Sequence, residues 1–183
     1  MDYFEEISSK LLEEQGYWIR RSLKIDLSKE EKRDIGKHTI PRPEIDIVAL
    51  DFRKNMVVAF EAKSFLDSPG VDYEELVKEH EVPEGRYKIF TCQNYREIVL
   101  RKLKEQLIAI GMANEKTQVS LGLIAGKVQK KKEEAIRELF NQRGWVFWSP
   151  SDVREKVAKL TKMGYENHAA VITAKILSPL LRE

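Results

Sequence analysis

Two apolar runs, separated by only three polar residues, place the strongest constraint on how this 183-residue chain folds. The first run covers residues 44–52, the second covers residues 56–64, and Arg53-Lys54-Asn55 lies between them. Two such runs joined by a short polar segment predict a β-hairpin, although the turn lacks the favoured Asn-Gly pair. The second run begins with Met56-Val57-Val58-Ala59-Phe60, which is typical of a buried strand.

Helices and further strands are predicted around this hairpin. Helical spacing of apolar residues up to Gly16 predicts a helix over 3–15, and alternation predicts a strand over 17–25. The polar segment 26–43 is expected to be a loop. The later elements are a short helix near 72–80, a helix over 95–111 capped by Thr91 or Asn94, a strand over 118–125, a helix over 130–142, a strand over 145–148, a helix behind the capping box Ser149-Pro150-Ser151-Asp152, and a last helix over 166–177. This order, α-β-β-β-α-β-α-β-α-α, predicts one α/β domain with a mixed sheet flanked by helices.

Composition excludes several classes of protein. With 42% hydrophobic and 34% charged residues the chain is neither disordered nor fibrous. No apolar run approaches the roughly 20 residues that span a bilayer, so no membrane association is expected. The acidic start of the chain is not typical of a secretory signal. The single cysteine, Cys92, has no internal disulfide partner and no histidine at zinc-ligand spacing, which argues against a zinc finger and favours the cytoplasm.

Charge is balanced overall but uneven along the chain. The formal net charge is only +2, so bulk charge does not indicate a nucleic-acid partner. Segment 66–85, however, carries seven acidic residues against one lysine, and segment 86–143 carries thirteen basic residues against six acidic ones. The basic part could follow a phosphate backbone, and the alternative is that both segments are solvated helix faces.

Three charged residues lie at one end of the predicted hairpin. If Arg53 and Lys54 form a two-residue turn, Asp46 lies directly opposite Glu61, and Lys63 shares the face of Glu61. Two adjacent carboxylates repel each other, and a hard divalent cation removes that repulsion. Mg²⁺ would take one oxygen from each acid, together with the backbone carbonyl of Ala62 and several waters. The alternative is a salt-bridge cluster in which Lys63 simply pairs with the two acids.

This pattern resembles the signature of the PD-(D/E)xK nuclease superfamily, which is an acid at the start of one strand, a hairpin, and then acid-x-Lys on the next strand. Pro43-Glu44-Ile45-Asp46 and Glu61-Ala62-Lys63 fit it. The first helix, with Phe4-Glu5-Glu6-Ile7 followed by Leu11-Leu12 and Gly16-Tyr17, is similar to that of Mrr-like restriction endonucleases and archaeal Holliday junction resolvases. In those families a glutamate of this helix contributes to the site, and its match here is Glu5.

The resemblance implies a restriction-endonuclease-like core, α-β-β-β-α-β, over about residues 1–125, with a C-terminal extension over about 126–183. It implies Mg²⁺- or Mn²⁺-dependent hydrolysis of DNA phosphodiester bonds in restriction, repair or recombination. Asp46 and Glu61 would hold the metal, Glu5 would act through a metal-bound water, and Lys63 would place or help to deprotonate the attacking water.

The candidate residues for contacts with the nucleic-acid backbone are Arg101, Lys104, Lys130, Lys131 and Lys132. Two alternatives stay open beside the nuclease: a non-catalytic module of the same fold that binds nucleic acid or protein, and a structural protein whose acids only form salt bridges. A homodimer also remains open.

Overall fold

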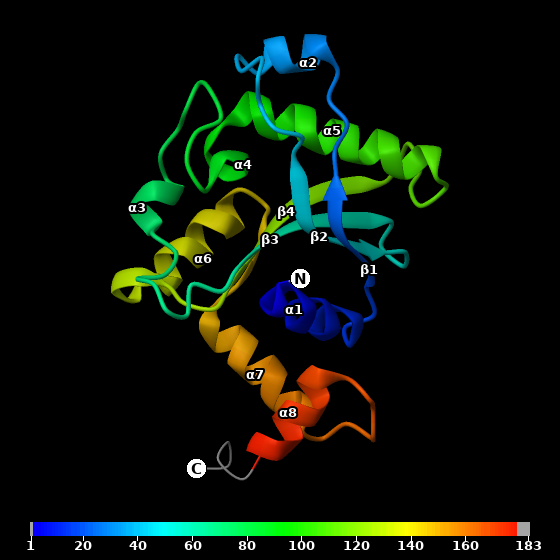
Figure 1. The fold of residues 1–183 in the computed structure, drawn as a ribbon, viewed down its shortest axis with the longest axis vertical. Coiled ribbons are helices and arrows are strands. Elements are labelled where there is room, and N and C mark those ends of the chain that lie inside the picture. Colours follow the sequence, from blue (N-terminus) through cyan, green and yellow to red (C-terminus); the bar gives the residue numbers. More distant parts are fainter. Residues whose placement is uncertain (1, 179–183) are drawn as a thin grey trace.

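The computed structural model describes residues 2–178, and a five-stranded sheet with helices on both faces organises them (Figure 1). The strands lie in chain order across the sheet: β1 (Trp18–Lys24), β2 (Glu44–Asp51), β3 (Met56–Lys63), β4 (Gln118–Ala125) and β5 (Val146–Trp148). β2 runs antiparallel to both of its neighbours, β1 and β3, whereas β4 runs parallel to β3 and β5 parallel to β4. The sheet is therefore mixed, as the sequence predicts.

The helices form two layers, one on each side of the sheet. Their bounds are α1 (Tyr3–Glu13), α2 (Lys29–Asp34), α3 (Tyr73–Leu76), α4 (Lys88–Thr91), α5 (Gln93–Ala109), α6 (Glu133–Gln142), α7 (Pro150–Leu160) and α8 (Ala169–Leu177), with a 3₁₀ turn η1 (Gln129–Lys131). Val57 and Ala59 of β3 face a core that includes residues of α3, α4, α5 and α6. Val58 and Phe60 face a second core with α1, α7 and α8. Alternate residues of each central strand thus bury on opposite faces, which explains why these strands are apolar almost throughout.

The hairpin has the register expected from the sequence. Ile47 pairs with Phe60 and Asp51 with Met56. The N–H of Asn55 donates to the carbonyl of Phe52 at 3.4 Å, which closes the turn around Arg53 and Lys54. Extending this register by one residue places Asp46 opposite Glu61.

Most long elements agree with the sequence prediction, and several boundaries differ. α1, β1, β4, β5 and α7 lie where they are expected, and Ser149 and Asp152 form the predicted capping box. The N-cap of α5 is Cys92, so the prediction of Thr91 or Asn94 as its cap was wrong. The helix predicted from residue 130 begins only at Glu133, because Lys130 and Lys131 have positive φ angles of 50° and 56°.

The polar regions contain more helix than expected. α2 lies inside the predicted loop 26–43, and its capping box between Ser28 and Glu31 was a local signal for it. α4 was not predicted, and the short helix expected near 72–80 is limited to α3. The last helix begins at Ala169 rather than residue 166, because the side chain of His168 caps it. None of the helices within residues 2–178 is long and apolar enough to cross a membrane.

Candidate functional site

The candidate site lies at the end of the sheet where β2 begins and β3 finishes. β1 pairs with β2 on either side of Ser22, which has a φ of 50° and stands opposite Asp46. Ile45 and Ile47 are buried in the two different cores, although strict alternation would place them on one face. The strand therefore changes face at Asp46. The Asp46 carboxylate accepts the backbone N–H of Ala62 at 2.9 Å, so it is directed towards β3.

Asp46, Glu61 and Lys63 converge at this point. The Lys63 Nζ lies 2.8 Å from an oxygen of Glu61 and 3.6 Å from an oxygen of Asp46. The three side chains are 16% to 21% exposed, so water reaches the cluster only in part. One ammonium group is thus shared by two carboxylates in a partly buried position, and the carboxylates remain in net excess.

Glu61 is held in an environment that disfavours its charge. Burial raises the pKa of the Glu61 carboxyl and the nearby Asp46 carboxylate raises it further, while the Lys63 ammonium acts in the opposite direction. Burial also acts against the charge of Lys63, but Glu61 and Asp46 outweigh it, so the pKa of Lys63 is raised. The buried Tyr95 of α5 lies near enough that burial, together with the Glu61 charge, raises the pKa of its phenol.

Glu5 of α1 approaches the same cluster from the opposite helical layer. Asp2 caps this helix by accepting the Phe4 N–H at 2.7 Å. Burial and the Asp46 carboxylate raise the pKa of Glu5 to about 7, with Lys63 acting against them. Glu6, the next residue, is instead directed to Arg21, whose guanidinium lies 3.9 Å away. Glu5 therefore shares the electrostatic environment of Asp46, whereas the Glu6 carboxylate lies near Arg21 and His168.

The oxygen donors at this end of the sheet fit a hard divalent cation. Since the N–H and C=O groups of one strand residue point to the same side, the Ala62 carbonyl faces the edge where its N–H meets Asp46. Mg²⁺ commonly uses one or two carboxylates and keeps several waters. Within residues 2–178 no group of three or more His, Cys, Asp or Glu side chains is placed to hold a metal. Two carboxylates and one backbone carbonyl form a donor set of the kind that Mg²⁺ takes while it keeps several waters.

Two of the residues expected to contact the nucleic-acid backbone have partners within the protein, away from the candidate site. Arg101 of α5 pairs with Glu31 at 3.0 Å and with Glu105 at 3.1 Å. Lys104 donates to the Glu115 carbonyl at 2.6 Å, in the loop before β4. The structure does not bring either of them to the Asp46 cluster.

The other three candidate contact residues, Lys130, Lys131 and Lys132, follow β4. The last residue of this strand, Ala125, pairs with Lys63, so the three lysines lie beyond the same end of the sheet as the cluster. Sequence reasoning missed Lys127 in this loop, although its position directly after Gly126 at the end of a buried strand was a local signal.

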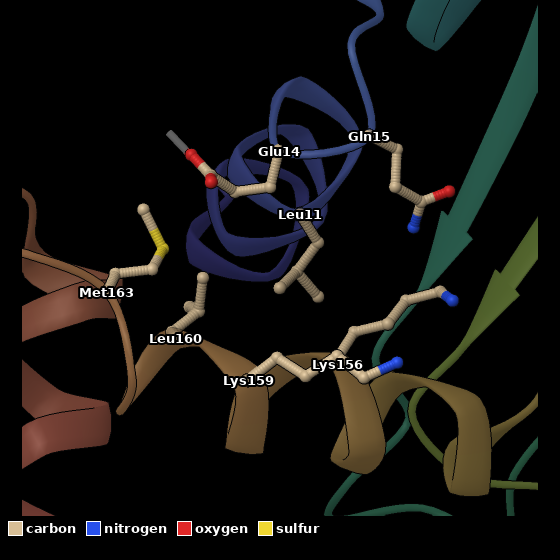
Figure 2. Close-up of a pocket in the computed structure, with 7 residues that line it drawn as sticks. All are labelled: Leu11, Glu14, Gln15, Lys156, Lys159, Leu160 and Met163. Carbon is tan, nitrogen blue, oxygen red and sulfur yellow. The ribbon is translucent and has the colours of Figure 1, made fainter.

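One groove lies at a distance along the molecule, between two helices. One cavity of about 310 Å³ separates α1 from α7 (Figure 2). Its lining residues are Leu11, Glu14, Gln15, Lys156, Lys159, Leu160 and Met163. Figure 2 shows the two lysine side chains of α7 extending towards Gln15. None of the lining residues belongs to the Asp46 cluster, so this groove is separate from the candidate site.

Comparisons of the chain with protein-family models, with curated proteins and with solved structures found no match. The chemistry of the site therefore has to be inferred from its own residues. Those residues are two carboxylates and one ammonium group in contact. A third carboxyl, that of Glu5, lies close enough that the charges of Asp46 and Lys63 shift its pKa.

Proposed function

We propose that the protein is a divalent-metal-dependent endonuclease that hydrolyses phosphodiester bonds in DNA. The observation that carries the proposal is the contact of Asp46, Glu61 and Lys63 at the end of the β2–β3 hairpin. The order of the core elements supports it, since three antiparallel strands are followed by α5 and by β4 parallel to β3. This is the arrangement expected of a restriction-endonuclease-like core, which the sequence motifs resemble.

Asp46, Glu61 and the Ala62 carbonyl would hold Mg²⁺ or Mn²⁺. When bound, the metal polarises a phosphoryl oxygen and lowers the pKa of a bound water. It would also relieve the repulsion that raises the pKa of Glu61. A cluster with an excess of carboxylate charge favours a divalent cation over a further monovalent partner.

Lys63 and Glu5 would supply complementary functions. Because its pKa is raised, Lys63 is protonated at neutral pH and can donate to water or offset the charge on phosphate. With a pKa of about 7, Glu5 is divided between its protonated and ionised forms near neutral pH. A carboxyl in that range can accept a proton from an attacking water. Glu5 would act through such a water and not as a direct metal ligand.

One observation favours a second candidate. Lys63 already pairs with both carboxylates, as a purely structural salt bridge would. The second candidate is therefore a module of the same fold that binds nucleic acid or protein without cleaving it. The two candidates differ in a single measurable property, which is cleavage that depends on a divalent metal.

The test is a panel of labelled DNA substrates comprising duplex, single strand, flap and four-way junction. Each is incubated with Mg²⁺, Mn²⁺ or EDTA. The wild type is expected to cleave at least one substrate, and only with metal. Lys63→Ala is expected to lower the rate by about 10²-fold or more, the scale of losing one preorganised electrostatic group. Its DNA affinity should fall far less, since other phosphate contacts remain.

The matched control is Lys54→Ala, in the same hairpin but at its opposite end, where Lys54 lies 3.8 Å from Asp51. It should cleave like the wild type. Full activity of a folded Lys63→Ala variant, or cleavage that persists in EDTA, would contradict the proposal. Melting temperatures of the same preparations separate a loss of catalysis from a loss of folding.

A further inference from the structure

The loop that follows β4 leaves the sheet beside the candidate site. Ala125 pairs with Lys63, and the Gly126 N–H donates to the Lys63 carbonyl at 2.9 Å. A Cβ atom at Gly126 would clash with the Ser64 carbonyl oxygen, so the segments that follow β3 and β4 leave the sheet in close contact. The segment from Lys127 to Lys132, called here the lysine loop, is thereby placed next to the end of β3.

The lysine loop is held by backbone hydrogen bonds. Val71 and Val128 form a parallel bridge in which the Val71 N–H donates to the Lys127 carbonyl at 2.9 Å. The Gln129 N–H returns a bond to the Val71 carbonyl at 2.9 Å. Lys130 and Lys131 both adopt a left-handed φ, which long side chains rarely do. The loop therefore has one defined shape although it is rich in charge.

The four lysines of this loop carry charge that no acid within residues 2–178 neutralises by an ion pair. Lys127 donates to the Leu66 carbonyl at 3.5 Å, and the Lys132 ammonium lies 5.5 Å from the centre of the Tyr73 ring. By contrast, Lys102 and Lys159 lie 2.7 and 2.6 Å from a glutamate oxygen.

The acids that follow the loop in the chain have other partners. Glu134 lies 3.7 Å from Arg137, and Glu133 accepts from the Ser151 hydroxyl at 3.1 Å. Four positive charges within six residues are therefore available to an external anion.

The shape of this surface suits an extended polyanion. Four ammonium groups follow one another within six residues of the chain. Successive phosphates of a nucleic acid strand can contact successive ammonium groups on such a loop.

We infer that the lysine loop binds the sugar-phosphate backbone of DNA while the Asp46–Glu61–Lys63 cluster acts on a neighbouring phosphate. This inference rests on the proposed nuclease function and adds the element that positions the substrate. It also separates the loop from Arg101 and Lys104, whose charged groups have partners within the protein.

The experiment compares two double variants that lose the same charge. Lys130→Gln/Lys131→Gln changes the lysine loop without adding strain, since glutamine and lysine meet the same backbone restriction. Lys54→Gln/Lys116→Gln changes two lysines near the opposite end of the sheet, where β3 begins. Affinity for a labelled duplex is measured in EDTA and in Ca²⁺ over a series of NaCl concentrations, with cleavage in Mg²⁺ measured in parallel.

For the loop variant the slope of log K against log[salt] should become shallower by about 1.8, since each phosphate contact contributes ~0.9. Affinity at 100 mM salt should fall by at least about tenfold. The control variant should keep the wild-type slope. Lys127→Gln/Lys132→Gln, outside the two left-handed positions, should behave like the first pair and provides the same test if Gln at 130 and 131 prevents folding.

The outcomes separate this inference from the proposed function. Equal slopes in the loop and control variants, with normal cleavage by the wild type, would overturn the inference alone. A slope difference without any metal-dependent cleavage would support the lysine loop as a DNA contact and overturn the nuclease proposal. Absence of DNA binding by the wild type in both EDTA and Ca²⁺ would overturn the inference, and absence of cleavage as well would overturn both.

Discussion

Strand β2 carries an aspartate near each end, and the two have opposite surroundings. Asp51, at the hairpin turn, is only 2% exposed. Its Oδ1 atom accepts the backbone N–H groups of Arg53 and Lys54 at 3.1 and 3.3 Å, and the Arg53 Nε at 3.2 Å. Burial raises the pKa of this carboxyl, but the Arg53 guanidinium and the backbone donors outweigh burial, so the pKa is lowered. Every close polar neighbour described for Asp51 is a donor.

Asp46, five residues earlier, is crowded by other acids. It accepts one backbone N–H, from Ala62. The Lys63 ammonium group lies closer to Glu61 than to Asp46. The pKa values of both Glu61 and Glu5 are raised, in part by the Asp46 charge.

The difference shows how a structural acid can be distinguished from a candidate functional one. The turn supplies Asp51 with the donors that it needs, so its charge stabilises the local backbone. The other end of the strand gathers carboxylates without enough donors, which costs stability unless a further cation binds. Carboxylates that lack enough hydrogen-bond donors depart from the usual pairing of partly buried charges, and such departures are expected at functional sites.

The largest expected effect concerns catalysis. Asp46→Asn should lower metal-dependent cleavage by about 10³-fold or more, since a Lewis acid is worth several kcal/mol and each tenfold in rate corresponds to roughly 1.4 kcal/mol. Its melting temperature in EDTA should be unchanged or higher, because one repelling charge is removed. Initial rates and melting curves on one preparation test both statements. Asp51→Asn is the matched control, and an Asp46→Asn variant with wild-type activity would remove the distinction between the two residues.

The next effect concerns metal binding. A metal that binds only the folded state stabilises it by about 2.7 kcal/mol at a hundredfold excess over Kd. Titration with Mn²⁺ should therefore raise the melting temperature of the wild type and of Asp51→Asn, but not of Asp46→Asn. A wild-type melting temperature that does not change with millimolar Mn²⁺ or Mg²⁺ would argue that the Asp46 cluster is only a structural salt bridge.

The third prediction concerns the turn. Asp51→Ala should lower the melting temperature by several degrees, because the hairpin backbone donors and the Arg53 guanidinium lose their acceptor. Since folding lowers the pKa of Asp51, its stabilisation is present at neutral pH and is lost as the pH falls below about 3.9. Urea unfolding of wild type and variant at pH 7 and pH 3 should show the difference shrink. A difference that is the same at both pH values would contradict the assignment.

The smallest expected effect is a folding stability that falls as the pH rises, which is the opposite of the Asp51 contribution. Folding raises the pKa of Glu5 from 4.5 to about 7, so the folded state binds more protons than the unfolded state in that interval. Stability in EDTA should fall as the pH rises from about 4.5 to 7, and Glu5→Gln should reduce the slope. Glu61 leaves a residual slope of the same sign, because its pKa is also raised. A slope that Glu5→Gln leaves unchanged would contradict the prediction.

The sequence by itself determined the parts that depend on neighbours along the chain. Period-2 alternation and the polar turn were enough to predict β2, β3 and their register, so Asp46 and Glu61 could be placed opposite one another. The capping box at Ser149 located the start of α7 for the same reason. The box at Ser28 carried the same information for α2, and only its polar surroundings concealed it.

Tertiary structure decided which charges from distant parts of the chain meet. The change of face at Asp46 occurs opposite Ser22 in another strand, and the raised pKa of Glu5 depends on how α1 packs across the sheet. Arg101 and Lys127 have the same formal charge in the sequence, yet one is paired with Glu31 and the other lies beside β3. Hydrophobic periodicity indicates which face of its own strand or helix each residue occupies. The energy between two charges depends on their distance in space, which is set only when strands and helices from distant parts of the chain pack together.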